Sequence, residues 1–93
     1  MSNSTRSRAH AAVIAALAAA RTEAGKTQRD VAEALPEWLG ITHITLAKIE
    51  TGRRSLSFVE AREIARVIGI SVQDLDRRTS ELLGLSTGVR RKK

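Results

Sequence analysis

Residues 27–50 read TQRDVAEALPEWLGITHITLAKIE, and TGRR follows at 51–54. The apolar spacing predicts a short helix, then a turn that contains glycine, then a second short helix rich in small polar side chains. Thr27 can cap the first helix, and Pro36 stops it because proline has no backbone N–H with which to continue. Thr42 can cap the second helix. The stretch therefore predicts two short helices joined by an irregular connection.

The second of these helices has one apolar side and one polar side. Leu46 and Ile49 are three residues apart, so both turn inward together. The opposite side carries Thr42, His43, Thr45 and Lys48. Such a helix fits the major groove of DNA, where outward side chains reach base edges, while the helix N-terminus and the cations that follow meet phosphates. Helix 42–50 is therefore the candidate recognition helix.

Three further helices are predicted around this pair. Residues 9–24 are rich in alanine, a strong helix former, and carry an apolar stripe. A fourth helix opens with a capping box, in which Ser57 is followed three residues later by Glu60. Ser71 and Asp74 repeat this arrangement at the start of a fifth helix. Whether the fifth helix continues as far as residues 82–83 stays open.

The inward faces of these helices define an all-α fold, a compact five-helix bundle. They are expected to carry Val13, Ile14, Leu17, Ala20 and Ala24 in the first helix, Val31, Ala32 and Leu35 in the second, Leu46 and Ile49 in the third, Phe58, Ala61, Ile64, Ala65 and Ile68 in the fourth, and Val72 and Leu75 in the fifth. The domain is expected to span residues 9–85. A disordered basic arm at 1–8 and a basic tail at 86–93 would flank it.

The composition agrees with one small helical domain. The chain has 93 residues, enough for a single modest core. Trp38 and Phe58 are its only aromatic residues, so alanine, leucine, isoleucine and valine must build the core. The chain has no cysteine, which excludes disulfides and thiolate metal sites.

The basic charge is concentrated at the two ends of the chain. The net charge is +6, yet residues 9–85 hold ten acidic and ten basic residues. Short basic tails on a neutral body are expected of arms that follow a phosphate backbone. The alternative is that these terminal charges only keep a small protein in solution.

Other classes of protein find little support. The stretch 11–20, AAVIAALAAA, follows Arg6 and Arg8 and imitates a secretion signal, but it is weakly hydrophobic and too short to span a bilayer. We expect a cytoplasmic protein associated with the nucleoid, with secretion as the alternative. The sequence contains no glycine-rich phosphate loop, no metal-binding motif and no arranged catalytic triad. Neither an enzyme nor a cofactor is expected.

The motifs in order resemble one known family. TQ opens the second helix, VAEAL follows along it, LGITHITLAKIETGRR runs through the third, and IARVIGISVQDL closes the pattern. This combination resembles the helix-turn-helix domains of the lambda-repressor, Cro and Xre type. The resemblance covers about Leu17 to Leu75. It implies a lambda-repressor-like fold and a transcriptional regulator that binds DNA.

The resemblance also implies roles for individual residues. Gln28 matches a glutamine that commonly bonds a phosphate and supports a recognition-helix side chain. The positions that face base edges are His43, Ile44 and Lys48, with Thr42 and Thr45 beside them. Thr51, Arg53 and Arg54 match a loop that contacts the DNA backbone. Arg21 and Glu50 match an internal ion pair that joins the first helix to the end of the third.

Several of these residues have an alternative interpretation. Lys48 could donate to a phosphate rather than to guanine. Ile44 could be a core residue, whereas in the groove its natural contact is a thymine methyl group. His43 could bind a metal, although His10 is its only possible histidine partner. Arg53 and Arg54 could belong to a solvated turn, and the Arg21–Glu50 pair could be two unrelated surface charges.

The connection between the two helices departs from the family pattern. Relative to that pattern the chain has four extra residues, which lengthen the path from Gln28 to His43. They are Leu35, Pro36, Glu37 and Trp38. This puts the role of Gln28 in doubt. We expect Trp38 to fill the enlarged turn against the core, with contact to the DNA backbone or to a protein as alternatives.

The sequence and this resemblance thus predict a sequence-specific regulator that acts on operator DNA as a homodimer. It is expected to repress its own promoter, with activation as the alternative. Two recognition helices about 34 Å apart would double the bases that are contacted. The expected dimer surface is the fifth helix, with Leu75, Leu82 and Leu83 together with Leu85. One alternative is a protein-interaction module that also binds DNA, such as an antitoxin or a co-activator. Another is a nucleic-acid binder without sequence preference.

Overall fold

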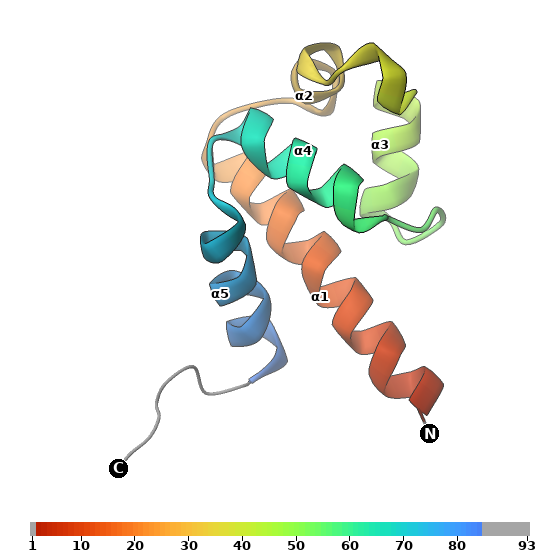
Figure 1. The fold of residues 1–93 in the computed structure, drawn as a ribbon, viewed down its shortest axis with the longest axis vertical. Helices are drawn as coiled ribbons and strands as arrows, with labels where there is room; N and C mark the ends of the chain where they lie inside the picture. The colour runs from red at the N-terminus through yellow and green to blue at the C-terminus, as the bar shows by residue number, and fades with distance from the viewer. Residues whose placement is uncertain (1, 85–93) are drawn as a thin grey trace.

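The computed structural model describes residues 2–84, with side chains from Arg8 onward. Five α-helices and one short 3-10 helix fill these residues (Figure 1). They are α1 (Ser2–Glu23), α2 (Gln28–Ala34), η1 (Glu37–Leu39), α3 (His43–Glu50), α4 (Phe58–Ile68) and α5 (Val72–Leu83). The part of the chain that is described contains no strand, so the all-α fold is confirmed.

Helix α1 is longer than the sequence predicted. It begins at Ser2 rather than at Ala9, so the disordered arm expected at residues 1–8 is corrected for residues 2–8. The chain has neither proline nor glycine before Gly25. Adding a residue to an existing helix costs far less than starting one, so the alanine-rich segment extends toward the N-terminus. The basic tail at 86–93 lies outside the described residues.

Helix caps set the other element boundaries. The side chains of Thr27, Thr42, Ser57 and Ser71 each accept a hydrogen bond from the backbone N–H three residues on. The capping box predicted at Ser57 is present, and Thr27 makes another with Asp30. The box expected at Ser71 is only half formed, because the Asp74 carboxylate bonds Arg77 and Arg78 instead.

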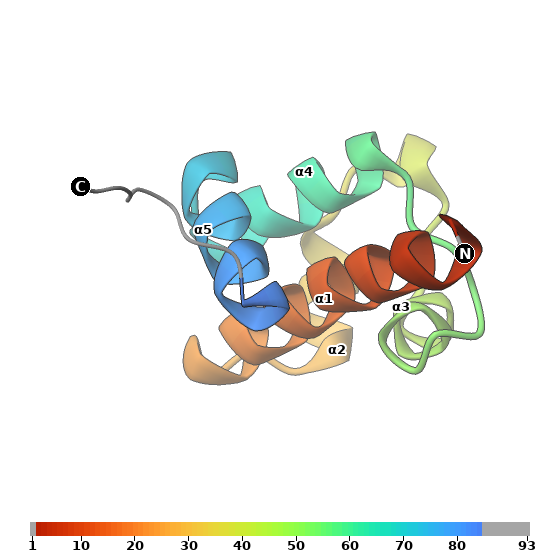
Figure 2. The same cartoon turned by 90° about the horizontal axis from the view of Figure 1, so that it is seen from below.

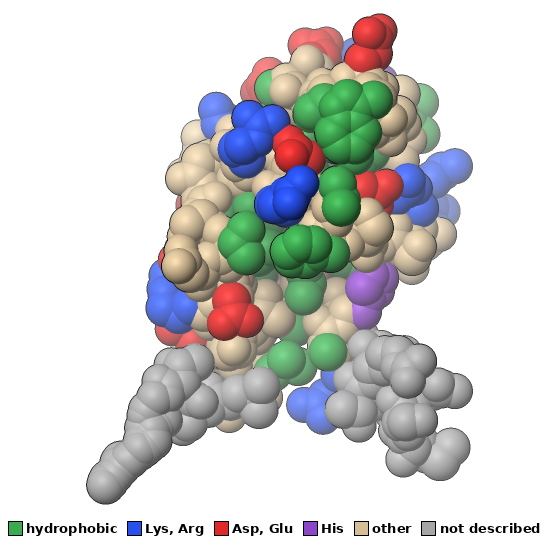
Figure 3. Space-filling model, in the orientation of Figure 1, with side chains coloured by type: hydrophobic (Ala, Val, Ile, Leu, Met, Phe, Trp, Pro, Cys, Tyr) green, Lys and Arg blue, Asp and Glu red, His purple; other side chains and the backbone are tan. Residues whose placement is uncertain are grey.

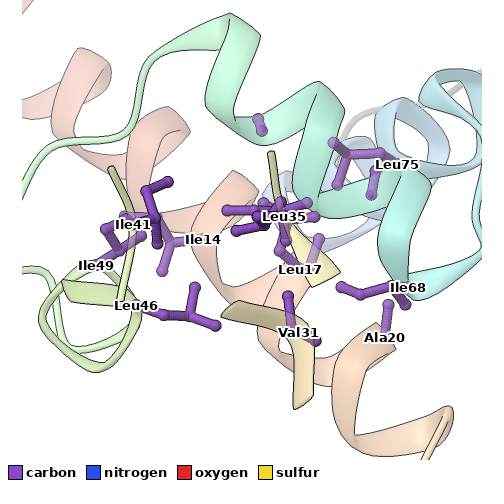
Figure 4. Close-up of a cluster of buried hydrophobic side chains, with 14 residues drawn as sticks. Ile14, Leu17, Ala20, Val31, Leu35, Ile41, Leu46, Ile49, Ile68 and Leu75 are labelled. Atoms are coloured by element: carbon purple, nitrogen blue, oxygen red, sulfur yellow. The ribbon is translucent and has the colours of Figure 1, made fainter. Parts of the chain in front are cut away.

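One hydrophobic cluster joins all five helices (Figure 4). Its buried members are Ile14, Ala16, Leu17, Ala20, Val31, Leu35, Ile41, Leu46, Ile49, Ala61, Ile64, Ala65, Ile68 and Leu75. Because alanines are small, the helix backbones can approach closely and pack to native density. Helix α5 lies along α1, while α2 and α3 pack together at one end of the molecule (Figures 1 and 2).

Three residues expected in the core lie at the surface. Phe58 is 67% exposed, Val72 is 42% exposed, and Ala24 is also exposed. Phe58 and Val72 are the first residues of their helices, where side chains lean back beyond the packed turns. Ala24 lies in the turn after α1 rather than in the helix. Helical periodicity predicted which side of each helix faces the core, but not that residues at the helix ends would be exposed.

No helix among residues 2–84 combines the length and the apolar character that crossing a membrane would require.

Candidate DNA-binding site

Helix α3 is fixed on its inner side and at its first turn. Leu46 and Ile49 are each 2% exposed and belong to the core. Thr42 caps the helix, since its Oγ1 accepts a hydrogen bond from the Thr45 backbone N–H at 3.2 Å. The rotation of α3 about its own axis is therefore set by packing, and the opposite side faces away from the core.

The outer side of α3 carries the residues expected to face bases. Ile44 is 58% exposed, which rules out the core interpretation. Lys48 is exposed, while His43 and Thr45 are half-buried. The Thr42 hydroxyl also lies 3.1 Å from the Thr45 hydroxyl, so both threonines are held at the start of the helix.

The side chains of the loop after α3 make more hydrogen bonds within the protein than the sequence suggested. Thr51 Oγ1 donates to the carbonyl oxygens of Ala47 and Lys48, at 3.0 and 3.2 Å. Arg54 makes two hydrogen bonds to Glu60, at 3.0 and 2.9 Å. Arg53 is exposed, and the described residues provide no hydrogen-bond or ion-pair partner for its side chain. Of the two arginines, Arg53 is therefore the one whose guanidinium is not engaged by other described residues.

The Arg54–Glu60 pair shifts the protonation of both groups. The Arg54 hydrogen bonds lower the pKa of the Glu60 carboxyl to about 2, with partial burial opposing them and the Ser57 cap adding to them. The same bonds raise the pKa of Arg54. Glu60 also closes the capping box of α4. Its charge therefore links the loop after α3 to the start of α4.

A hydrogen-bonded group joins three helices behind the site. Arg21 Nε and Nη2 donate to the two carboxylate oxygens of Glu50, at 2.8 and 2.9 Å. The pair that the family resemblance implied is thus present, and the bonds to Glu50 raise the pKa of Arg21. Arg21 also donates to the Lys26 carbonyl oxygen at 2.8 Å. The end of α3 is thereby tied to α1.

Gln28 takes part in the same group. Its Nε2 donates to Glu50 Oε1 at 2.8 Å. The longer connection therefore does not separate Gln28 from α3. Gln28 meets Glu50, the last residue of α3.

Arg29 is a site residue that the sequence analysis missed. Its Nη2 lies 3.2 Å from Nε2 of His43, which brings a cation from α2 to the start of the recognition helix. The sequence places Arg29 directly after Gln28, but spacing alone could not show which of the two side chains reaches α3.

The turn between α2 and α3 does not bury its tryptophan. Trp38 is 70% exposed, so the expectation that it fills the turn against the core is wrong. The core behind the turn is already occupied by Leu35 and Ile41, with Leu39 packed against them. Gly40 closes η1 with φ at +67°, a left-handed conformation that glycine adopts without strain.

A second surface feature lies away from the recognition helix. Hydrophobic side chains run down the face that α4 and α5 present in Figure 3. A mostly apolar groove of about 310 Å³ opens where α1, α4 and α5 meet. Its lining includes Val13, Leu56, Phe58, Val72 and Leu75, with Arg62 and Asp76 beside them. The groove joins the exposed Phe58 and Val72 into one surface.

Comparisons with known proteins point to one family. A family model described as "Helix-turn-helix" matches residues 17–75, which is more than half of the chain. The match includes α2, η1, α3 and α4 in full. Comparison with curated proteins and with solved structures gave no match.

Proposed function

Because this chain belongs to the helix-turn-helix family of lambda-repressor, Cro and Xre proteins, we propose that it is a sequence-specific transcriptional regulator that inserts α3 into the major groove of operator DNA. Membership of the family makes the chain a DNA-binding regulator. The proposal adds the mode of binding, sequence preference and the role of a repressor. It also places the protein on DNA in the cytoplasm.

The observation that carries the proposal is the orientation of α3. Leu46 and Ile49 fix its inner side in the core, so Ile44 and Lys48 project from the outer side. Lys48 can donate to guanine, and Ile44 offers a methyl contact to thymine. Arg53, just beyond the helix, is placed to neutralise a phosphate.

A titration with two duplexes tests this function. One duplex is the DNA upstream of the protein's own coding region, and the other is a scrambled duplex of the same composition. Fluorescence anisotropy should show at least tenfold tighter binding to the first. Lys48→Ala should reduce that preference by about 1–3 kcal/mol, whereas Arg53→Ala should weaken binding to both duplexes alike.

Arg66→Ala is the control for lost positive charge, because Arg66 is exposed on α4 and pairs only with Glu63 among the described residues. It should leave the preference between the two duplexes unchanged. Equal affinity of the unmodified protein for both duplexes would contradict sequence-specific regulation.

We also propose that the protein acts as a homodimer, through a surface that differs from the one expected. Leu75 lines the groove but is only 7% exposed, so it offers little surface to a second copy, and Leu83 is half-buried. Leu82 is 58% exposed on α5. Phe58 and Val72 are the exposed apolar side chains that line the groove itself.

The charges beside the groove support a two-fold arrangement. Arg62 of α4 and Asp76 of α5 both line it and carry opposite signs. In a two-fold symmetric contact each residue of such a pair meets the other residue of the second copy. Sedimentation equilibrium should show a dimer that Phe58→Ser and Arg62→Asp weaken, and that the double variant Arg62→Asp/Asp76→Arg restores. A monomer at every protein concentration would contradict the proposed dimer.

A further inference from the structure

The contact between Arg29 and His43 joins the two helices of the motif at their DNA-facing ends. Arg29 Nη2 lies 3.2 Å from His43 Nε2, over a shallow hollow that Glu33 and Thr42 also line. Glu33 is one turn along α2 from Arg29, yet the described residues contain no salt bridge between them. The guanidinium therefore meets the imidazole in preference to a nearby carboxylate.

This contact defines where the imidazole proton lies. An arginine N–H can only donate a hydrogen bond, so Nε2 of His43 must be the acceptor. In the neutral ring the single proton is then on Nδ1. Neutral histidine in water prefers the other tautomer, with the proton on Nε2. The Arg29 contact thus selects the form that water disfavours.

We propose that Arg29 is a positioning residue that holds His43 in the Nδ1–H tautomer, and so makes His43 a hydrogen-bond donor toward a base. The inference rests on the proposed function, because it concerns the base that α3 recognises. A donor in the major groove pairs with guanine O6 or N7, with adenine N7 or with thymine O4, and has no partner in the amino group of cytosine. His43 should therefore favour guanine over cytosine at the base pair it meets.

Two features of the structure favour this role over a direct phosphate contact by Arg29. The guanidinium is already engaged with the ring in the protein alone. The ring is half-buried, so its orientation is constrained, and the described residues show no other hydrogen bond that would fix its tautomer. Arg29 acts on the base through His43.

The first experiment reads the tautomer directly in the free protein. Long-range ¹H–¹⁵N correlation spectra at pH 8 distinguish Nδ1–H from Nε2–H rings, and the chain has only two histidines. His43 should show the Nδ1–H pattern. Arg29→Glu should convert it to the Nε2–H pattern, because a carboxylate accepts from Nε2, while Arg29→Lys should preserve it.

His10 supplies an internal reference for these spectra. Its Nε2 accepts a hydrogen bond from the Leu56 backbone N–H at 3.2 Å, far from Arg29 in the chain. Its ring should show the Nδ1–H pattern in every variant. The glutamate of Arg29→Glu lies in the first turn of α2, where an acid is favourable, so the fold should be retained.

The second experiment measures base preference at the pair contacted by His43. Affinities are compared for operator duplexes that carry guanine or cytosine there, because a ratio cancels the uniform loss from altered charge. Arg29→Glu should lower the guanine-to-cytosine ratio by about three- to tenfold, the effect of one lost hydrogen bond. Arg29→Lys should keep most of the ratio, and Arg66→Glu, the control for charge reversal, should leave it unchanged.

The outcomes separate this inference from the proposed function. An Nε2–H pattern for His43 in the unmodified protein overturns the inference even if the operator is bound specifically. The inference is also overturned if Arg29→Glu lowers the affinity for all duplexes equally and flattens the dependence of log affinity on log salt. Arg29 would then contact a phosphate. The protein could instead fail to bind any duplex while His43 still shows an Nδ1–H pattern that depends on Arg29. That result would contradict the proposed function but would support the assigned tautomer of His43.

Discussion

The carboxylate of Glu50 accepts three hydrogen bonds, two from Arg21 of α1 and one from Gln28 of α2. The Arg21 and Glu50 side chains are only 16% and 11% exposed. At such a site both partners have given up much of their hydration, so removing one leaves the other charge without compensation. This group should therefore stabilise the joint of α1, α2 and α3.

The first prediction concerns this buried pair. Glu50→Ala should lower the free energy of unfolding by about 2–3 kcal/mol, because Arg21 and Gln28 lose their acceptor in a partly dry site. Urea denaturation measures the loss. Glu81→Ala is the matched control, since its partner Arg77 and Glu81 itself are both more than half exposed, and it should change stability negligibly. Equal losses in the two variants would contradict the prediction.

A second prediction concerns pH and the Glu60 carboxyl. Its pKa in the folded protein is about 2, below the usual 4.5. A lowered pKa means that this stabilisation is complete above about pH 4.5 and is lost as the pH falls toward 2. Thermal unfolding of the unmodified protein should show this loss between pH 5 and 2.

Glu60→Gln isolates the contribution of that carboxyl. The variant should be less stable at pH 6, by about 1–2 kcal/mol, because it loses the charged bonds to Arg54 and weakens the capping box. The difference between the two proteins should shrink as the pH approaches 2, where Glu60 is itself protonated. A difference that stays constant from pH 6 to 2 would show that the charge is unimportant.

Among the elements, η1 and its flanking turn distinguish this motif from the family pattern. The added residues leave Leu35 in the core and Trp38 at the surface, and Gly40 turns the chain into α3. An exposed indole contributes little to the free energy of unfolding. A buried leucine of α3 contributes the full free energy of transfer from water to the core, and its removal also leaves a cavity. The turn should therefore tolerate change that α3 does not.

The third prediction compares these two elements. Trp38→Ser should change the free energy of unfolding by less than about 0.5 kcal/mol, while Leu46→Ala should cost about 2–5 kcal/mol. Denaturant titrations of the two variants measure both effects. A loss of several kcal/mol for Trp38→Ser would mean that the indole packs against the domain.

For the whole molecule, we expect the basic ends of the chain, more than its electrically balanced body, to set how strongly any DNA is held. Acidic and basic residues balance within 9–85, and four of the remaining bases lie at positions 90–93. Charges that neutralise phosphates release counterions, which makes affinity depend on salt but not on sequence. Removing these bases should therefore act alike on all duplexes.

The fourth prediction tests that separation with a shortened chain. Deleting residues 86–93 should flatten the dependence of log affinity on log salt by roughly 0.9 for each phosphate that the tail neutralises. The preference for operator over scrambled DNA should persist. A full-length variant with glutamine at positions 90–93 controls for length. An unchanged salt slope in both proteins would show that the tail does not follow the DNA backbone.

Those properties that depend on neighbours in the chain were determined by the sequence alone. The caps at Thr42 and Ser57 follow from short-range hydrogen bonds, and the inward direction of Leu46 and Ile49 follows from helical periodicity. The order of motifs was enough to predict the family and its all-α fold. The caps and the inward faces of the helices depend on residues three or four apart in the chain, so the local sequence is enough to predict them.

Only the tertiary structure decided which side chains meet across helices and which remain outside. It exposed Trp38 and Phe58, both expected to pack inward. Leu35 and Ile41 already occupy the core behind Trp38, and Phe58 is the first residue of α4, beside the open groove. The tertiary structure also turned Gln28 to Glu50 and Arg29 to His43, a choice between adjacent residues that spacing cannot make. Such contacts depend on the relative placement of whole helices, which is set by packing over the entire core rather than by any local pattern.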